Sequence, residues 1–289
     1  MIRNILLLVI MVCSSAGIFA GRPTVYLNKF ENSGKIKNGL AEMVRGAVLE
    51  GMYNTNLVNI IDADTEATRY EEELRRLKEN LTTDDLETTE ALQTRGANVL
   101  ISGDITAFPI EKGKYYRSRK DSVGETRYKA SATFILRLVN AVDGTMLKAR
   151  TFNISSSYGD GFHYSDSKTE AKAIQSVKSR ISNAMRDFTI ASFPKVAMVE
   201  GVGEISKNNK DVKTLYIGLG SDDGIMKGYK YNVCVQKQVG SKVVTDVIGK
   251  VEVTSVSGRD ISLCKVKKGG SEIKRALDLN QPLYVVTTL

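Results

Sequence analysis

His163 is the only histidine in the sequence, so it is the first side chain to test for chemistry. It lies between Phe162 and Tyr164, and as an imidazole it could form half of an acid–base pair or supply one metal ligand. A metal site, however, needs several convergent nitrogen, sulfur or oxygen ligands, and no second histidine or nearby cysteine accompanies it. We therefore interpret His163 as a solvent-exposed turn residue.

Two further patterns resemble catalytic or phosphate-binding motifs. Asp62, Asp64 and Glu66 follow an apolar run, and carboxylates at the end of a strand can form an active site. We favour the alternative that they cap the next helix. The run GLGSDDG at residues 218–224 leads into a strand-like segment rather than a helix, so we interpret it as a turn and not as a phosphate loop. The sequence therefore predicts a protein that is not an enzyme, with no cofactor and no metal site.

A polar insertion at residues 111–129 is the most distinctive surface. Basic side chains outnumber acidic ones there, and tyrosines are interleaved with them; tyrosine and arginine are enriched at protein interfaces. We hypothesise that this insertion docks an acidic partner or a neighbouring subunit, the alternative being a solvated hairpin tip. The candidate partner-binding residues are Lys114, Tyr115, Tyr116, Arg117, Arg119, Lys120, Arg127 and Tyr128.

The first twenty residues differ in kind from the rest. A single basic residue, Arg3, precedes an apolar run that ends in small residues near Ala20, which is the pattern of a secretory signal peptide. The apolar run is too short for a membrane-spanning helix, and we predict none in the mature chain. We do not expect lipidation at Cys13, because bulky residues precede it. The expected location is the periplasm or the outer membrane.

Charge and cysteine content limit the partners. The net charge is +8, from 41 basic and 33 acidic residues, and the two signs are interspersed, so no nucleic-acid-binding stripe is predicted. After signal removal only Cys234 and Cys264 remain. An oxidising compartment would permit a disulfide between them, and two buried free thiols are the alternative.

The elements that would position these residues form two domains. Residues 21–194 alternate strands (24–30, 57–61, 98–108, 127–140, 145–157) with helices (35–52, 65–80, 83–94, 167–190), which predicts a layered α/β domain with a mixed sheet. Residues 195–289 consist of short alternating segments separated by turn residues. This pattern predicts a small all-β barrel or sandwich.

The order of these elements resembles the CsgG superfamily of bacterial envelope proteins. The matching phrases include Asn28 with Phe30-Glu31-Asn32, the stretch Gly96–Gly103, the hairpin around Asp143-Gly144, and the final Phe193-Pro194. Residues 195–289, with glycines at 218, 220, 224 and 228, resemble the C-terminal β domain of the flagellar assembly protein FlgT.

The resemblance implies an exported accessory or scaffold protein of the envelope, which binds a partner protein or itself. One alternative is an oligomeric secretion channel in the outer membrane. We do not expect a pore, because residues 109–128 and 153–166 lack the alternation that lipid-facing strands require. The second alternative is an envelope enzyme that acts on glycans through two carboxylates.

Overall fold

The structure is a computed structural model that describes residues 22–63, 97–118, 120–141, 144–157, 160–239 and 242–288. Its contacts divide the chain into two compact units. The first comprises Pro23–Asn54 and Asn59–Arg186, and the second takes in Thr55–Val58 and the chain from Asp187 onward. The expected signal peptide, Cys13, Asp64, Glu66, Arg119 and the expected helices at 65–80 and 83–94 lie outside the described residues.

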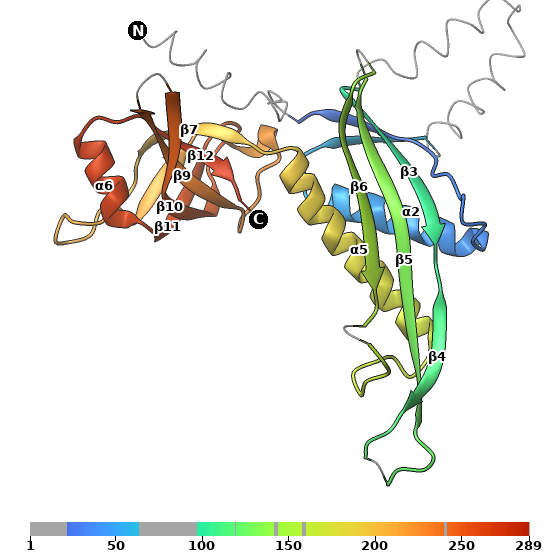
Figure 1. Cartoon of the computed structure of the whole chain (residues 1–289). Coiled ribbons are helices and arrows are strands. Elements are labelled where there is room, and N and C mark those ends of the chain that lie inside the picture. Colours follow the sequence, from blue (N-terminus) through green and yellow to red (C-terminus); the bar gives the residue numbers. More distant parts are fainter. Residues whose placement is uncertain are drawn as a thin grey trace, which may run out of the picture. The chain divides into compact units, whose positions relative to one another are not determined.

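A curved mixed sheet forms the first unit (Figure 1). β1 (Thr24–Leu27) lies between β2 (Asn59–Asp62) and β3 (Val99–Ala107), parallel to both. β5 (Glu125–Asn140) then pairs antiparallel with β3 on one edge and with β6 (Met146–Ser155) on the other. Because hairpins force antiparallel pairing, the sheet is mixed, as the sequence predicts.

Two helices cover one face of this sheet. α2 (Asn38–Tyr53) and α5 (Glu170–Ser192) lie side by side, and they approach closely at Gly51, where an added Cβ would overlap the Ser182 carbonyl oxygen. The strand residues that face the helices are buried, with Phe134, Leu136 and Leu138 alternating along β5. The core therefore lies between the helices and the sheet.

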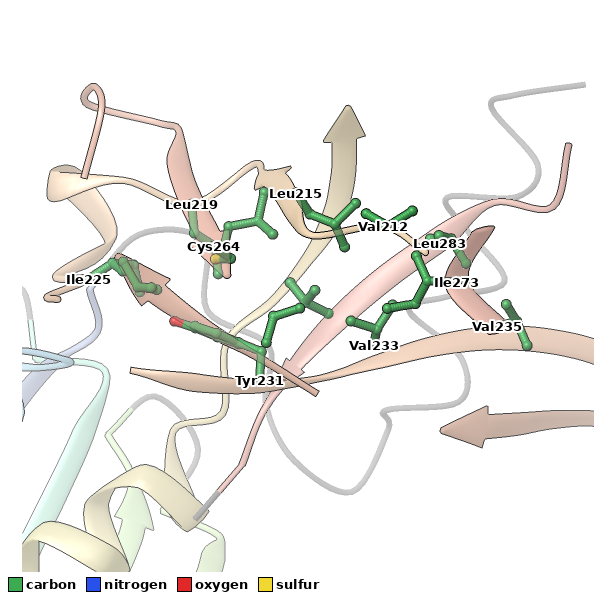
Figure 2. Close-up of a cluster of buried hydrophobic side chains, with 14 of the residues drawn as sticks. Val212, Leu215, Leu219, Ile225, Tyr231, Val233, Val235, Cys264, Ile273 and Leu283 are labelled. Atoms are coloured by element: carbon green, nitrogen blue, oxygen red, sulfur yellow. The ribbon is translucent and has the colours of Figure 1, made fainter. Parts of the chain in front are cut away.

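The second unit is a closed barrel of six strands in the order β10-β11-β8-β7-β12-β9. Inward-pointing side chains fill it, and Figure 2 shows Tyr231, Val233 and Val235 of β9 pointing into the interior. Full closure removes the exposed sheet edges that small β domains would otherwise present. The strands are β7 (Val196–Val202), β8 (Thr214–Ile217), β9 (Lys230–Val239), β10 (Lys242–Val256), β11 (Ser262–Lys268) and β12 (Leu283–Thr287).

The fold class predicted from the sequence is confirmed, with one addition. A short helix, α6 (Gly270–Asp278), packs Ile273 and Ala276 into the barrel core, where we expected strands alone. The GLGSDDG run is a turn, as predicted: a short 3₁₀ helix (Ser221–Asp223) ends at Gly224, whose φ of 78° suits glycine. No described helix combines the length and the apolarity needed to cross a bilayer.

The two cysteines of the barrel are free and buried. Cys264 belongs to the interior cluster, whereas Cys234 alternates with the inward-pointing Val233 and Val235 and so faces outward. Thiols on opposite sides of the barrel wall cannot bridge without rearranging the strands. Of the two alternatives left by the sequence, the structure therefore has two buried free thiols.

Burial raises the pKa of the Cys234 thiol to about 11 and that of the Cys264 thiol to about 12. Only thiolates react readily, so we expect both to resist a disulfide-exchange reagent at neutral pH in the folded protein. Both should react at once in denaturant. The measurement is colorimetric thiol titration with and without guanidinium, and rapid labelling of the native chain would contradict the buried positions.

Candidate functional site

The polar insertion forms a hairpin that extends from the sheet of the first unit. β4 (Ile110–Tyr115) pairs antiparallel with Glu125–Ala130, the first part of β5. β3 pairs with the same edge of β5 further along, and Ser131 bridges the junction by donating its N–H to the Pro109 carbonyl at 3.0 Å. The hairpin is therefore built on one long strand that also runs through the core.

Residues 160–169, which include the end of a second polar insertion at 153–166, form a strap that packs on this hairpin. The Phe162 ring occupies the space that a side chain at Gly113 would fill. The Tyr128 N–H donates to the Ser167 carbonyl at 2.8 Å, and the Lys129 ammonium lies 5.4 Å from the centre of the Phe162 ring. Two insertions that are distant in sequence thus make one structure, which we call the strapped hairpin (residues 110–130 with the strap).

Arg127 is the centre of the strapped hairpin. It is 1% exposed, and its guanidinium lies 5.9 Å from the Tyr115 ring centre and 5.2 Å from that of Tyr164 on the strap. It forms an ion pair with Glu125 and donates to the Asp166 carbonyl at 3.3 Å. Arg127 is thus buried between two rings, a carboxylate and the strap backbone. It fastens the hairpin to the strap.

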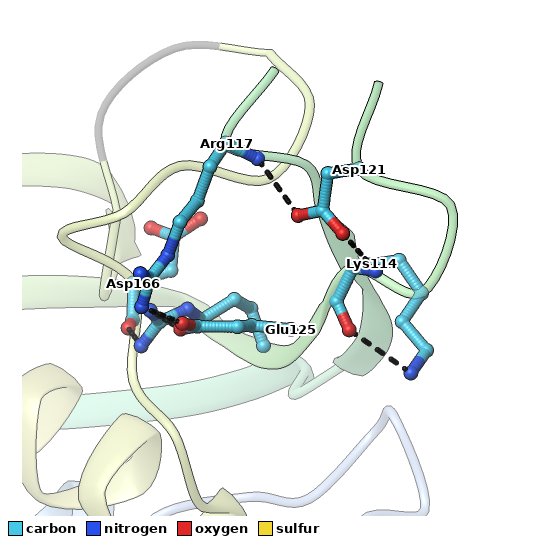
Figure 3. Close-up of polar contacts among 7 residues, drawn as sticks. Lys114, Arg117, Asp121, Glu125 and Asp166 are labelled. Carbon is cyan, nitrogen blue, oxygen red and sulfur yellow. Dashed lines mark hydrogen bonds and ion pairs between the residues drawn. The ribbon is translucent and has the colours of Figure 1, made fainter. Parts of the chain in front are cut away.

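Glu125 also accepts from Arg117, so one carboxylate joins a buried and an exposed guanidinium (Figure 3). The hydrogen bond from Arg117 is the main reason that the pKa of Glu125 is lowered, and the charges of both arginines add to it. The same contact raises the pKa of Arg117. Both groups are therefore charged at neutral pH.

Asp121 orders the loop at the hairpin tip. Its carboxylate accepts backbone N–H groups from Gly124 at 3.1 Å, Arg117 at 3.2 Å and Val123 at 3.3 Å, the first two of which chiefly lower its pKa. Gly124 has a φ of 60°, a conformation that glycine adopts without strain. The tip is therefore a closed turn rather than a free loop.

The candidate residues divide into an exposed and a buried set. Lys114, Arg117 and Lys120 are exposed, and Tyr116 is 54% exposed beside Val123, which is 75% exposed. Tyr115 and Tyr128 are half-buried. The prediction that Arg127 faces a partner needs correction, because its guanidinium is enclosed by the strap and has no surface to offer.

Sequence reasoning missed the residues that complete this site. Local pattern gives Glu125 and Asp166 no role, and it marks Phe162 and Tyr164 only as neighbours of His163. The available signal was the interleaving of aromatic and acidic residues in GFHYSD, which complements the basic and aromatic first insertion. Pattern alone does not show that two such segments meet.

His163 is an exposed residue of the strap, as predicted. Its backbone N–H donates to the Asp166 carboxylate at 2.7 Å, and its ring Nε2 lies 2.6 Å from the Asp160 carbonyl oxygen. Within the described ranges, no group of three histidine, cysteine or acidic side chains is placed to hold a metal ion. Of the three acidic residues first considered together, Asp62 forms an ion pair with Arg45 of α2.

A pocket of about 220 Å³ lies between the hairpin base and the strap, with Glu111, Lys129, Asp160 and Phe162 in its lining. Glu111 and Asp160 are both solvent-exposed. The pocket is smaller than the 300–1,000 Å³ of typical small-molecule sites. What distinguishes this region is instead its exposed, ordered and basic tip, which suits protein docking.

Comparisons with known proteins leave the function open. No family model matches the sequence, and no curated protein matches it. Solved structures that align include a PelC dodecamer from Paraburkholderia phytofirmans, with 10% identity over 59% of this chain and 93% of that one, at a TM-score of 0.33. Others are the hypothetical protein CT253 from Chlamydia trachomatis (12%, 59% and 94%, TM-score 0.31) and lipoprotein GNA1162 from Neisseria meningitidis (17%, 56% and 99%, TM-score 0.27). TM-scores below 0.5 carry no functional argument, so the function must follow from the chain's own residues.

Proposed function

We propose that this chain is an exported accessory protein of the cell envelope, and that it docks an acidic surface of a partner protein with the tip of the strapped hairpin. The observation that carries the proposal is the division of charge in this hairpin. Glu125 and Asp121 are occupied by internal contacts, whereas Lys114 and Lys120 are exposed at the tip, where Lys114 donates to a neutral acceptor, the Gly124 carbonyl, at 3.5 Å.

The tip is also ordered before any partner arrives. Asp121 closes the turn, Glu125 aligns Arg117, and the strap holds the base through Arg127. Ordering a loop on binding costs free energy, so a pre-formed tip binds more tightly than a free one with the same side chains. Tyr116, with two rotatable side-chain bonds and a large exposed ring, is a suitable anchor at the centre of such a contact.

Two features of the sequence support the envelope part of the proposal. The first twenty residues have the pattern of an export signal, and the element order resembles the CsgG superfamily, whose members assemble or dock in the envelope.

Crosslinking tests the proposal directly. A photoreactive residue in place of Tyr116 should capture a specific partner in living cells, and the partner's affinity can then be measured with purified proteins. Lys114→Glu with Lys120→Glu should weaken binding by at least about tenfold, because charge reversal places like charges face to face. Both lysines are exposed, and neither belongs to the contacts of Arg127.

The matched control makes the same charge change elsewhere. Lys207→Glu with Lys210→Glu alters two exposed lysines of the barrel unit, and the affinity for the partner should stay at the wild-type value. The advantage of the unmodified tip should also shrink as salt concentration rises. Equal affinity of the tip variant and the wild type, at low salt, would refute the docking role of the tip.

A further inference from the structure

β6 has one edge of its backbone open. The carbonyl groups of Ile101, Gly103 and Ile105 and the N–H of Ile105 bond the segment that follows β1, so Leu100, Ser102 and Asp104 of β3 must be the residues that bond β5. Their partners Val139, Arg137 and Ile135 carry odd numbers. Because adjacent residues of a strand direct their backbone groups to opposite edges, the even-numbered residues of β5 bond β6.

This parity identifies the open groups. Lys148, Arg150, Phe152 and Ile154 lie opposite the even-numbered residues of β5 and use their backbone groups there, a pattern that the Ser156 N–H continues by donating to the Ala130 carbonyl at 2.8 Å. Between them, the residues that direct their N–H and carbonyl groups away from β5 are Ala149, Thr151 and Asn153. In the part of the chain that the structure describes, no strand pairs with this edge.

The open edge is accessible and straight enough to accept a strand. All three of the residues just named are exposed, and the ten-residue strand contains no proline. Its one register irregularity lies at the Leu138/Val139 end of the pairing with β5. Natural edges are commonly blocked by proline, bulges or shortness, and β6 has none of these along its central part.

The side chains of β6 determine which charge an added strand should carry. On the face shared with the buried Phe152, Lys148 and Arg150 stand two residues apart, and the Arg150 guanidinium lies 4.9 Å from the Phe152 ring centre. Burial first, and then the charge of Arg150, lower the pKa of Lys148, so the two cations are close enough to repel each other. The opposite face offers only uncharged residues.

We propose that β6 accepts an extended acidic segment of a partner protein as an additional strand, with carboxylates at alternate positions beside Lys148 and Arg150. Backbone hydrogen bonds to the open edge would supply affinity, and the two cations would supply specificity. This surface is separate from the hairpin tip, and the inference does not depend on the docking function proposed above.

A second copy of this chain is a poorer occupant of the same edge. Antiparallel pairing of two β6 strands about a twofold axis would put Lys148, Arg150 and their counterparts on one face of the joined sheet. Like charges on neighbouring strands destabilise a sheet. An acidic strand instead neutralises the pair.

The test uses the full chain and two synthetic peptides of about ten residues, the length of a typical strand. One carries glutamate at alternate positions between valine and threonine, and the other has the same composition with its glutamates consecutive. Fluorescence anisotropy should show binding of the alternating peptide only. Arg150→Glu should weaken that binding by at least about tenfold through like-charge contact, whereas Lys114→Glu with Lys120→Glu at the hairpin tip should leave it unchanged.

Two further measurements separate strand addition from loose charge attraction. Thr151→Pro removes an outward N–H without touching the β5 ladder and should abolish binding, while Thr151→Ala should preserve it. Amide exchange should slow at Ala149, Thr151 and Asn153 when the peptide binds, which requires no variant to fold. Absence of binding, binding of both peptides alike, unchanged exchange at these three amides, or self-association of the chain through this edge would each overturn the proposal.

Discussion

Gly51→Ala is expected to destabilise the first unit by about 2–3 kcal/mol, the upper part of the range for overpacking a dense core. Gly51 is buried where α2 crosses α5, and a methyl group there would overlap the Ser182 carbonyl and lie 2.7 Å from Met185 Cβ. The obstacle is largely backbone, which cannot rotate away as a side chain can. Denaturant unfolding of the full chain measures the loss.

The same substitution five residues earlier, at Gly46, should change the stability in the opposite direction. An added Cβ at Gly46 meets nothing within 4 Å, and the residue is exposed on the same helix. Gly46→Ala should therefore stabilise the unit by about 0.5–1 kcal/mol, because alanine loses less backbone entropy in a helix than glycine. Similar effects of the two variants would mean that α2 and α5 do not pack as described.

Arg127→Leu is expected to release the strap from the hairpin. The variant leaves the Glu125 carboxylate with Arg117 alone, and it deletes the contacts to Tyr115 and Tyr164. Because these contacts hold the strap, protection of the Tyr128 amide, which bonds Ser167, should fall at least about tenfold in hydrogen exchange. Unfolding of the barrel unit should be unaffected.

Arg117→Leu is the matched control for this effect. Arg117 pairs with the same carboxylate but is exposed. The strap should keep its protection in this variant, since exposed ion pairs contribute little to stability. Equal loss of protection in the two variants would show that the pairing with Glu125, and not the enclosure of Arg127, holds the strap.

The main elements could be predicted because each carries a strong pattern. The spacing of Val44, Ala47, Val48 and Met52 predicts α2, and all four are buried. Alternation predicts β5, and the short turn-separated segments predict the barrel strands. Periodicity reports which face of an element is buried, and that was sufficient for the fold class.

Only part of the candidate site could be predicted from the sequence. β4 has no apolar alternation, because the surface that it buries belongs to Phe162 of the strap rather than to the helices. Arginine is usually a surface residue, and Arg127 is enclosed because the Tyr164 ring of the strap packs against it. α6 is too short to show a clear period. Each of these features depends on contacts between distant segments, which local patterns do not encode.

One strand, β5, runs through the interior of the first unit and also forms one arm of the hairpin that bears the candidate docking tip. β5 has sixteen residues, which corresponds to about 50 Å of extended chain, and it is bonded along its length to β3 and then β4. An extended ladder of this kind resists stretching and sliding far more than a jointed loop would. A force applied at Tyr116 would therefore be transmitted to the residues packed beneath α2 and α5. A partner held at the tip would move together with the folded core of the first unit.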